Sequence, residues 1–397
     1  MDALTLSAED ILPADGIRGA LVGRVWRPEH GGPSVVALRA ASDGAAHVID
    51  ITATHRTVSD LCETPDPAAA LRAADGEDLG PLDAILANAP PDARDPSRPW
   101  LLAPVDLQAL KAAGVTFATS MLERVIEERA RGDLLAATAI RAEVERLVGN
   151  DLRRLKPGSA EAMALKDVLV AQGAWSQYLE VGIGPDAEIF TKAQPLSSVG
   201  CGADAGLHPE SHWNNPEPEI ALAVASDQRI VGATLANDVN LRDFEGRSAL
   251  LLGKAKDNNA SCALGPFLRL FDDGFTLDTI RRTTVSLDVR GPDGFRLEGN
   301  SPLAEISRDP EELVAALMGT THRYPDGAML LLGTMFAPTK DRHGPGLGFT
   351  HVEGDHVSVA SPELGRLVNR MRPCNACEPW TFGAGALMRN LARRGLL

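Results

Sequence analysis

Two glutamates, Glu217 and Glu219, stand one residue apart where an apolar run begins, in HWNNPEPEIALAV at residues 211–223. Side chains two positions apart leave the same face of an extended strand, so both carboxylates are expected to point the same way. The following residues on that face are small, which predicts open space beside the carboxylates: Ala221, Ala223 and Ala225. The residues between them are larger and are interpreted as core: Ile220, Leu222 and Val224.

A second strand is expected to bring a third carboxylate to this face. SDQR at 226–229 predicts a turn, and RIVGATLAND at 229–238 returns from it. A hairpin symmetric about Asp227 and Gln228 places Asp238 opposite Glu217. Opposed side chains of a sheet lie about 5 Å apart at Cβ. The pattern therefore predicts that three carboxylates converge.

Three carboxylates this close repel one another unless a proton or a cation lies between them. Carboxylate oxygens suit Mg²⁺, Mn²⁺ or Ca²⁺ better than zinc. We therefore predict a divalent-metal site with Glu217, Glu219 and Asp238 as ligands. The alternative is a solvated strand face, with two exposed glutamates and a turn-forming Asn-Asp pair.

The composition of the chain limits the class of protein. Its 397 residues suggest about two domains, and 44% hydrophobic residues allow a sizeable core. With a net charge of −15 and no basic run, the chain is not expected to bind nucleic acid through its phosphate backbone. A local basic pocket for a small anion stays compatible with this charge.

Nothing in the sequence predicts secretion or membrane insertion. The opening residues, MDALTLSAEDILPADG, lack the basic start and the apolar stretch of a signal peptide. No apolar run approaches the ~20 residues that span a bilayer. The 5 cysteines are odd in number and scattered, unlike a disulfide framework. We expect a cytoplasmic protein with reduced thiols and no membrane partner.

The pattern of elements predicts an α+β fold. Short strand-like segments fill residues 1–60, and residues 60–100 are rich in Ala, Pro and Asp, which suggests a linker or a surface excursion. We predict a smaller N-terminal domain at 1–100 and a second domain at 101–397. The second begins with a helical block at 120–147 and becomes rich in strands from 175 onward. Further helices are expected near 246–256, 310–319 and 384–394.

EPEIALAV at 217–224 and ANDVNLRD at 236–243 resemble the signature of the fumarylacetoacetate hydrolase superfamily. Its members carry a Glu-x-Glu strand followed by Asn-Asp-x-x-x-Arg-Asp. Three further motifs are similar in order and spacing: FTK at 190–192, KDNNASCALGP at 256–266 and LLLGTMFAPT at 330–339. The resemblance covers 175–360 well, 101–130 weakly and 1–100 hardly at all. It implies a β-rich catalytic domain at 101–397 and the same three metal ligands.

The resemblance also implies substrate contacts. It places Lys256 against the carboxylate or enolate of the substrate, Thr334 on the substrate carboxylate, and Lys192 near the pocket mouth. Arg242 and Asp243 match the Arg-Asp pair that closes the ligand loop, and we include Arg242 among the substrate-binding candidates. Asn237 is a further candidate, although turn formation explains an asparagine there equally well.

One segment departs from the family pattern. Family hydrolases that cleave C–C bonds have a His and a Glu three residues apart, whereas GVTFATSMLER at 114–124 has Ser120 and Glu123 there. The departure makes the usual activation of a water nucleophile doubtful. We predict Ser120 as a substrate contact and Glu123 as the general base, with a solvent-facing role as the alternative for Glu123.

This departure and the long N-terminal part resemble the sugar-acid branch of the superfamily, the 2-keto-3-deoxypentonate (xylonate or arabinonate) dehydratases. The implied reaction is Mg²⁺-dependent dehydration to 2,5-dioxopentanoate in pentose catabolism, by a homodimer or homotetramer. A 2-keto acid chelates the metal, and the metal stabilises the enolate that forms when a C3 proton leaves. One alternative is a hydrolase or decarboxylase of an acylpyruvate or oxaloacetate-like acid. Another is a non-catalytic binding protein.

Three other motifs are interpreted without a catalytic role. Cys374 and Cys377 form a single Cys-x-x-Cys, and with no second pair they predict two ordinary thiols. His208 and His212 are expected in a loop that lines the pocket, because prolines disfavour a helix there. GPGLGF at 344–349 does not follow a strand, so it predicts a flexible loop rather than a nucleotide site.

Overall fold

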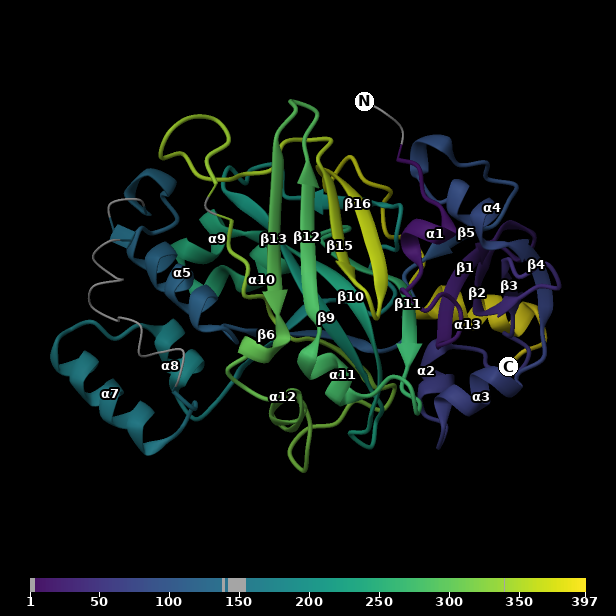
Figure 1. The fold of residues 1–397 in the computed structure, drawn as a ribbon, viewed down its shortest axis with the longest axis horizontal. Helices are drawn as coiled ribbons and strands as arrows, with labels where there is room; N and C mark the ends of the chain where they lie inside the picture. Colours follow the sequence, from purple (N-terminus) through teal and green to yellow (C-terminus); the bar gives the residue numbers. More distant parts are fainter. Residues whose placement is uncertain (1–3, 138–139, 142–154, 339) are drawn as a thin grey trace.

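Two β-sheets packed face to face form the centre of the computed structural model, which describes residues 4–137, 140–141, 155–338 and 340–397 (Figure 1). Within these residues the larger sheet has 11 strands in the order β4-β3-β2-β1-β11-β10-β9-β14-β6-β7, with β5 paired to β1. Its strands are β1 Ala20–Arg27, β2 Gly32–Ala40, β3 Ala46–Asp50, β4 Glu77–Pro81, β5 Trp100–Leu102, β6 Ala109–Gly114, β7 Glu188–Ala193, β9 Asn214–Val224, β10 Ile230–Leu241, β11 Cys262–Leu270 and β14 Ala328–Leu331.

The smaller sheet, of 5 strands within the same described residues, follows the order β13-β12-β15-β16-β8. Its strands are β8 Asp204–Leu207, β12 Thr284–Arg290, β13 Arg296–Pro302, β15 His356–Ser361 and β16 Gly365–Pro373. The described α-helices are α1 Ala8–Ile11, α2 Val58–Cys62, α3 Pro67–Ala73, α4 Leu82–Ala87, α5 Ala118–Arg129, α7 Ala160–Ala171, α8 Gln177–Ile183, α9 Arg242–Arg247, α10 Leu252–Lys256, α11 Leu277–Arg282, α12 Pro310–Leu317 and α13 Ala384–Arg393. The α+β prediction is confirmed.

The predicted hairpin is present with its predicted register. Strands β9 and β10 are antiparallel, and Asp238 lies opposite Glu217 while Ala236 lies opposite Glu219. The register shifts only near the turn, between Ile230 and Gly232. The alternation of side chains along the two strands therefore decides which residues reach each face of the sheet.

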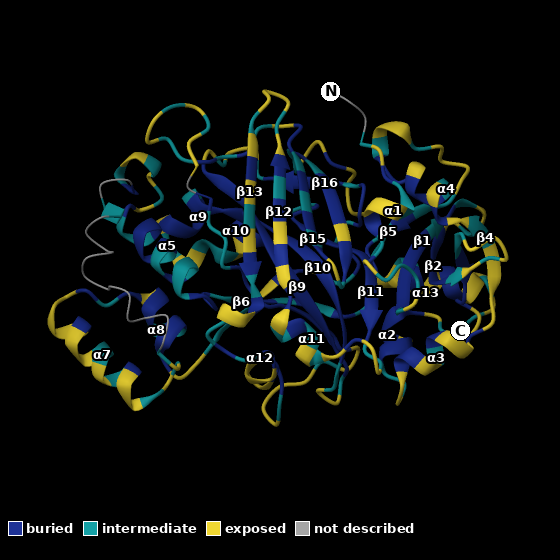
Figure 2. Cartoon of the chain, viewed as in Figure 1, coloured by how far each residue is buried: buried dark blue, intermediate teal, exposed yellow. Residues whose placement is uncertain are grey.

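One face of this hairpin packs against the smaller sheet. Ile220 and Leu222 belong to a hydrophobic cluster that includes Leu287 of β12 and Val359 of β15. In Figure 1, β12, β13, β15 and β16 lie in front of β9 and β10, and Figure 2 shows β9 and β10 buried along their length. Burial on both faces fixes the position of the hairpin, because any slip would expose apolar side chains.

The other face of β9 differs from the prediction of open space beside the carboxylates. Ala221, Ala223 and Ala225 do not border open space, because all three are buried in a second hydrophobic cluster. That cluster also contains Leu264 of β11 and Met329 of β14. Small residues here allow close packing of neighbouring side chains. The carboxylates Glu217 and Glu219 lie nearer the start of β9, before this packed region begins.

Residues 60–100 are not the predicted linker. They contain most of α2, together with α3, β4 and α4, and they bury Leu61, Leu71, Leu82 and Leu86. Strand β1 pairs with β11, so the N-terminal strands extend the larger sheet. The Ala-rich and Pro-rich composition was misleading because Asp66 caps α3 and Pro67 occupies its first turn. The domain boundary near residue 100 stays a prediction.

The helical block predicted at 120–147 is interrupted rather than continuous. Helix α5 ends at Arg129, Arg131 has a φ of 52°, and residues 134–137 and 140–141 are helical again. The parts of this prediction at 138–139 and 142–147 lie outside the described residues. The helix predicted at 246–256 is divided into α9 and α10, whereas α12 and α13 confirm the other two predicted helices.

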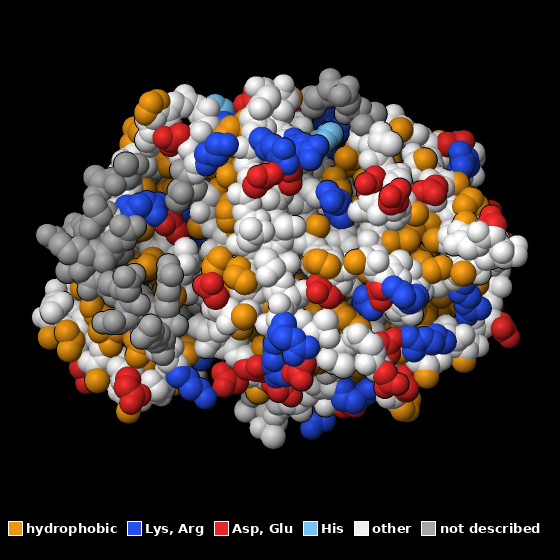
Figure 3. Space-filling view, viewed as in Figure 1, with side chains coloured by type: hydrophobic (Ala, Val, Ile, Leu, Met, Phe, Trp, Pro, Cys, Tyr) orange, Lys and Arg blue, Asp and Glu red, His pale blue; other side chains and the backbone are white. Residues whose placement is uncertain are grey.

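Two surface properties complete the description. Among the described residues no helix has the length and apolar character needed to cross a membrane. On the face drawn in Figure 3, Lys and Arg side chains are interspersed with Asp and Glu side chains. The net charge of −15 is therefore not gathered into one acidic region on that face.

The packing of β9 predicts a large loss of stability when its central leucine is truncated. Leu222 is 0% exposed and faces the smaller sheet, so Leu222→Ala should lower the free energy of unfolding by about 2–5 kcal/mol. Chemical denaturation monitored by circular dichroism measures this change. Val170→Ala on α7, where the side chain is 53% exposed, is the control and should change stability by less than about 0.5 kcal/mol. Equal effects of the two substitutions would contradict the described packing.

Candidate metal centre

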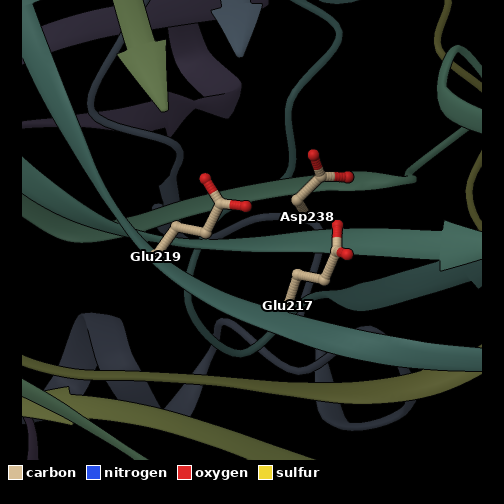
Figure 4. A group of neighbouring side chains, drawn as sticks. All are labelled: Glu217, Glu219 and Asp238. Carbon is tan, nitrogen blue, oxygen red and sulfur yellow. The ribbon is translucent and has the colours of Figure 1, made fainter. Parts of the chain in front are cut away.

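Glu217, Glu219 and Asp238 bring their carboxylates together, as Figure 4 shows. One oxygen from each lies within 4.8 Å of the others, and all three residues are buried. Glu217 and Glu219 come from β9, and Asp238 comes from the paired position of β10. The alternative of a solvated strand face is therefore wrong. Hard oxygen donors in this arrangement can hold a divalent cation.

Basic side chains surround two of these carboxylates. The Lys256 ammonium lies 2.9 Å from Glu217 Oε2 and 3.3 Å from Asp238 Oδ1. Lys192 Nζ lies 2.8 Å from Asp238 Oδ1, and Arg124 Nη2 donates to Glu217 Oε1 over 2.8 Å. Glu219 instead accepts a hydrogen bond of 2.7 Å from the backbone N–H of Gly333. Positive charge therefore reaches Glu217 and Asp238 directly, but not Glu219.

The pKa values follow this distribution. Burial would raise the pKa of Asp238, but Lys192 and Lys256 hold it below its ordinary value. Burial, together with the carboxylates of Asp238 and Glu217, raises the pKa of Glu219 well above its ordinary value. The site thus has a deficit of positive charge at Glu219. Three carboxylate donors with an unbalanced charge fit a divalent cation, and these residues would hold it.

A pocket with a volume of about 50 Å³ opens beside the three carboxylates. Five acidic residues line it: Glu188, Glu217, Glu219, Asp238 and Glu245. Two basic residues line it, Arg124 and Lys256. Its lining residues come from β6, β7, β9 and β10 of the larger sheet and from α5, α8, α9 and α10. Such a concave, enclosed site is suited to a small polar ligand.

Three predicted site residues border this pocket. Ser120 of α5, Thr334 after β14, and Lys256 at the end of α10 all line it. The Ser120 hydroxyl donates to Phe117 O over 2.9 Å, and the Thr334 hydroxyl accepts from Phe336 N over 3.1 Å. Burial would lower the pKa of Lys256, but Asp238, Glu217 and Glu245 raise it well above its ordinary value. Its ammonium group therefore stays protonated and positively charged in the pocket.

Lys192 and Asn237 are not where we predicted them. Lys192 is 0% exposed rather than at a pocket mouth, and besides Asp238 it donates to the backbone oxygens of Lys256 and Val239. Lys192 therefore positions the Asp238 carboxylate and is buried beneath it. Asn237 points to the other face of β10, where its amide lies near Met371 Sδ. Successive side chains of a strand point to opposite faces, so the Asn237 side chain points away from the face that carries the Asp238 carboxylate. It therefore does not reach the pocket.

Arg242 and Glu123 form a buried ion-pair cluster instead of a substrate site. Arg242 Nη2 lies 2.8 Å from Glu123 Oε2, and its Nε lies 2.6 Å from Glu127 Oε1. Arg141 also pairs with Glu123. Burial would raise the pKa of Glu123, but Arg141 and Arg242 lower it below its ordinary value. Neither Arg242 nor Glu123 lines the pocket. Glu123 is therefore poorly suited to act as the base.

The His208–His212 loop supports α9 rather than lining the pocket. The ring of His208 packs edge-on against Phe244 of α9, and Asp243 accepts hydrogen bonds from Ser211 Oγ and His212 N, both at 2.8 Å. Asp243, which matches the Asp of the pair that closes the ligand loop in the family, thus holds the 211–212 segment. Cys374 and Cys377 carry free thiols. The segment 344–349 forms neither a helix nor a strand.

Sequence reasoning missed four pocket residues: Arg124, Tyr178, Glu188 and Glu245. Arg124 pairs with Glu127, Glu217 and Glu245. The Tyr178 hydroxyl lies 3.4 Å from the backbone oxygen of Glu245. Glu188 lies two residues before the FTK motif, and this position is the only sequence signal that could have identified it. The other three lie in charged or irregular segments where such residues usually face water.

Glu188 has a different environment from the other acids. Outside the three predicted ligands, Glu245 pairs with Arg124 and with Lys256, whereas Glu188 makes no ion pair with a described residue. Burial and the Glu245 carboxylate raise the pKa of Glu188 above its ordinary value, against the opposing effect of Arg124 and Lys256. A half-buried carboxylate with a raised pKa is suited to take up and release a proton.

Comparison with known proteins gives consistent matches. Residues 216–372 match the family model described as fumarylacetoacetate (FAA) hydrolase C-terminal. A probable 2-keto-3-deoxyxylonate dehydratase of Haloferax volcanii is 30% identical over 193 residues, covering 48% of this chain and 62% of that protein. A 2-dehydro-3-deoxy-D-arabinonate dehydratase of Saccharolobus solfataricus is 30% identical over 188 residues, covering 47% and 58%. The match spans about three fifths of these curated relatives.

A solved structure shares the fold. It is a 2-keto-3-deoxy-D-arabinonate dehydratase complexed with magnesium and 2,5-dioxopentanoate, with a TM-score of 0.59 and 19% sequence identity. The superposition covers 89% of this chain and 99% of that chain. This similarity places both chains in the same fold.

Removal of a ligand charge should weaken cation binding. Glu217→Gln or Asp238→Asn replaces an anionic oxygen donor, so each should raise the Kd for Mn²⁺ or Mg²⁺ at least about tenfold, measured by isothermal titration calorimetry. Glu210→Gln is the control, because Glu210 is exposed and pairs only with Lys254 among the described residues. Unchanged Kd values in both ligand variants would exclude this site.

Proposed function

Because residues 216–372 belong to the fumarylacetoacetate hydrolase family, we propose that this chain is a metal-dependent hydro-lyase that dehydrates a 2-keto-3-deoxypentonate to 2,5-dioxopentanoate. The observation that carries the proposal is the pocket in which the three carboxylates, Lys256 and Glu188 meet. The two curated relatives are named as dehydratases of such acids. We propose magnesium as the cation, since a solved neighbour is complexed with it.

The charge of the pocket supports a substrate with a single anionic group. Its two lining cations, Arg124 and Lys256, are each paired with two or more carboxylates within the described residues. These carboxylates balance the two positive charges, so the pocket has no surplus positive charge for a phosphate, which usually requires dedicated cationic or backbone N–H donors. A sugar acid without a phosphate therefore fits better than a phosphorylated one. Its carboxylate and keto oxygens can be held by the cation and by Thr334.

The bound cation would stabilise negative charge on the keto oxygen when the C3 proton leaves. Glu188 accepts that proton, since it is the pocket acid outside the ligand set that no described cation neutralises. Lys256 places a second positive charge near the same region. The C4–O bond then breaks, and the hydroxyl leaves as water with the proton that Glu188 had taken up. Moving a C5 proton to C3 gives an enol, and transfer of its O–H proton to C4 forms the aldehyde at C5.

A substrate panel tests the proposed reaction. Purified protein with Mg²⁺ and a panel of 2-keto acids should convert 2-keto-3-deoxyxylonate or 2-keto-3-deoxyarabinonate to 2,5-dioxopentanoate, identified by mass spectrometry. Chelator should abolish the conversion, and added Mg²⁺ should restore it. Formation of pyruvate from an acylpyruvate or oxaloacetate, without dioxopentanoate, would favour the hydrolase or decarboxylase alternative. The oligomer, a homodimer or homotetramer in our prediction, can be measured on the same sample by sedimentation.

The assignment of Glu188 as the base predicts a specific kinetic loss. Glu188→Gln should lower kcat by about 10²–10⁴-fold while the Kd for Mg²⁺ changes little, because Glu188 is not a ligand. In the unsubstituted enzyme kcat/KM should rise with pH, since the base must be ionised. The midpoint of that rise should lie above the ordinary glutamate pKa of about 4.3. Its raised pKa sets this direction.

Two variants provide the comparison for Glu188. Glu210→Gln changes an exposed glutamate and should leave kcat unchanged. Glu123→Gln changes a buried glutamate outside the pocket and should lower thermal stability more than it lowers kcat. If a folded Glu123→Gln protein lost far more activity than Glu188→Gln, the roles of the two glutamates would be reversed.

A further inference from the structure

Lys256 makes an unusual number of charged contacts for one ammonium group. Its Nζ lies 2.9 Å from Glu217 Oε2, 3.3 Å from Asp238 Oδ1 and 3.2 Å from Glu245 Oε1. The Lys256 side chain is only 2% exposed to solvent. The ammonium donates hydrogen bonds to Glu217 and Asp238, while its contact with Glu245 is an ion pair without a hydrogen bond. Lys256 is therefore bound as an internal cation.

Two of these acceptors belong to the predicted metal-ligand set. Glu217 Oε2 and Asp238 Oδ1 come from neighbouring strands, and Lys256 lies between them. The other oxygen of Glu217 accepts from Arg124, and Asp238 Oδ1 also accepts from Lys192. Both Glu217 oxygens are thus occupied by cationic donors. A divalent cation that binds Glu217 must compete with one of them.

Of the two donors to Glu217, Lys256 is the one that a divalent cation would displace. Arg124 is held by Glu127 and Glu245 as well as by Glu217, so its position does not depend on the metal ligands alone. Its guanidinium contacts only Glu217 among the three ligands. Lys256 contacts two of the three ligands, which is the arrangement expected of a divalent cation. Two cations that share the same two oxygens repel each other strongly in a buried site.

We propose that Lys256 is a built-in competitor of the divalent cation: its ammonium holds Glu217 and Asp238 until the cation takes these oxygens. The ammonium then keeps its contact with Glu245 and turns to the pocket, where the substrate binds. Lys256 thereby links cation binding to the presentation of a positive charge to the substrate. The inference relies on the cation of the proposed function, but it concerns binding and not turnover.

The competition predicts a gain of affinity when the lysine is neutralised. Lys256→Met should lower the Kd for Mn²⁺ or Mg²⁺ about tenfold or more, measured by isothermal titration calorimetry on chelator-treated protein without substrate. The increase in Tm on addition of Mg²⁺ should also be larger than in the unsubstituted protein, because tighter binding stabilises the folded state more. Lys254→Met is the matched control. Lys254 lies on the same helix, pairs with Glu210 and does not line the pocket.

A second variant guards against loss of folding. Removal of Lys256 leaves buried carboxylates uncompensated, so Lys256→Met combined with Glu245→Gln removes one acid together with the lysine. This double variant should also bind the cation more tightly than Glu245→Gln alone. Equal or weaker binding in both lysine variants would overturn the proposal, because Lys256 would then support the site rather than compete for it. If the unsubstituted protein bound the cation but did not dehydrate the substrate, the proposed function would be rejected. The proposal about Lys256 would still be tested by the Kd values.

Discussion

Repulsion among the carboxylates of Glu217, Glu219 and Asp238 is the constraint that organises the surrounding structure. Buried in an environment of low polarity, three such groups cannot all stay ionised without nearby positive charge. Lys192 contributes charge from β7, Lys256 from the end of α10 and Arg124 from α5. Elements far apart in the sequence therefore have to meet at one point of the larger sheet.

Each of these cations is itself positioned by other groups. Lys192 bonds to two backbone oxygens, and one of them belongs to Lys256. Arg124 is held by Glu127 and Glu245, and Glu127 in turn pairs with Arg242 of α9. Removing one member would leave a buried charge without its partner, which costs more than the interaction gains on formation. The cluster thus fixes α5, α9 and α10 around the pocket.

Hydrophobic packing supplies the rigid support for this charged site. The side chains of β9 that face the smaller sheet are buried, and those on the carboxylate face are covered beyond Glu219 by a second cluster. The carboxylates therefore stand at the edge of a tightly packed region. Fixed side-chain positions of this kind let a few polar groups bind a small ligand with a defined geometry.

The sequence alone predicted the β9–β10 hairpin and the three carboxylates that meet on it. Alternation along β9 and β10, with a turn between them, predicted the register that pairs Glu217 with Asp238, because strand pairing repeats every two residues. The motifs at Lys256 and Thr334 identified two further pocket residues, and the helices α12 and α13 followed from local patterns. These predictions depend on short stretches of chain.

Only the tertiary structure decided which acid is free and which is paired. Glu123 is buried and Glu188 is half-buried. Helix α5 folds against α9 and gives Glu123 the partner Arg242, while Glu188 faces the pocket without an ion pair to a described residue. Partners 119 residues apart leave no local pattern in the sequence. The burial of Lys192 and the opposite orientation of Asn237 likewise depend on which strands and helices cover them. Long-range packing therefore decided the surroundings of the charged side chains, whereas local periodicity had already brought the three carboxylates together.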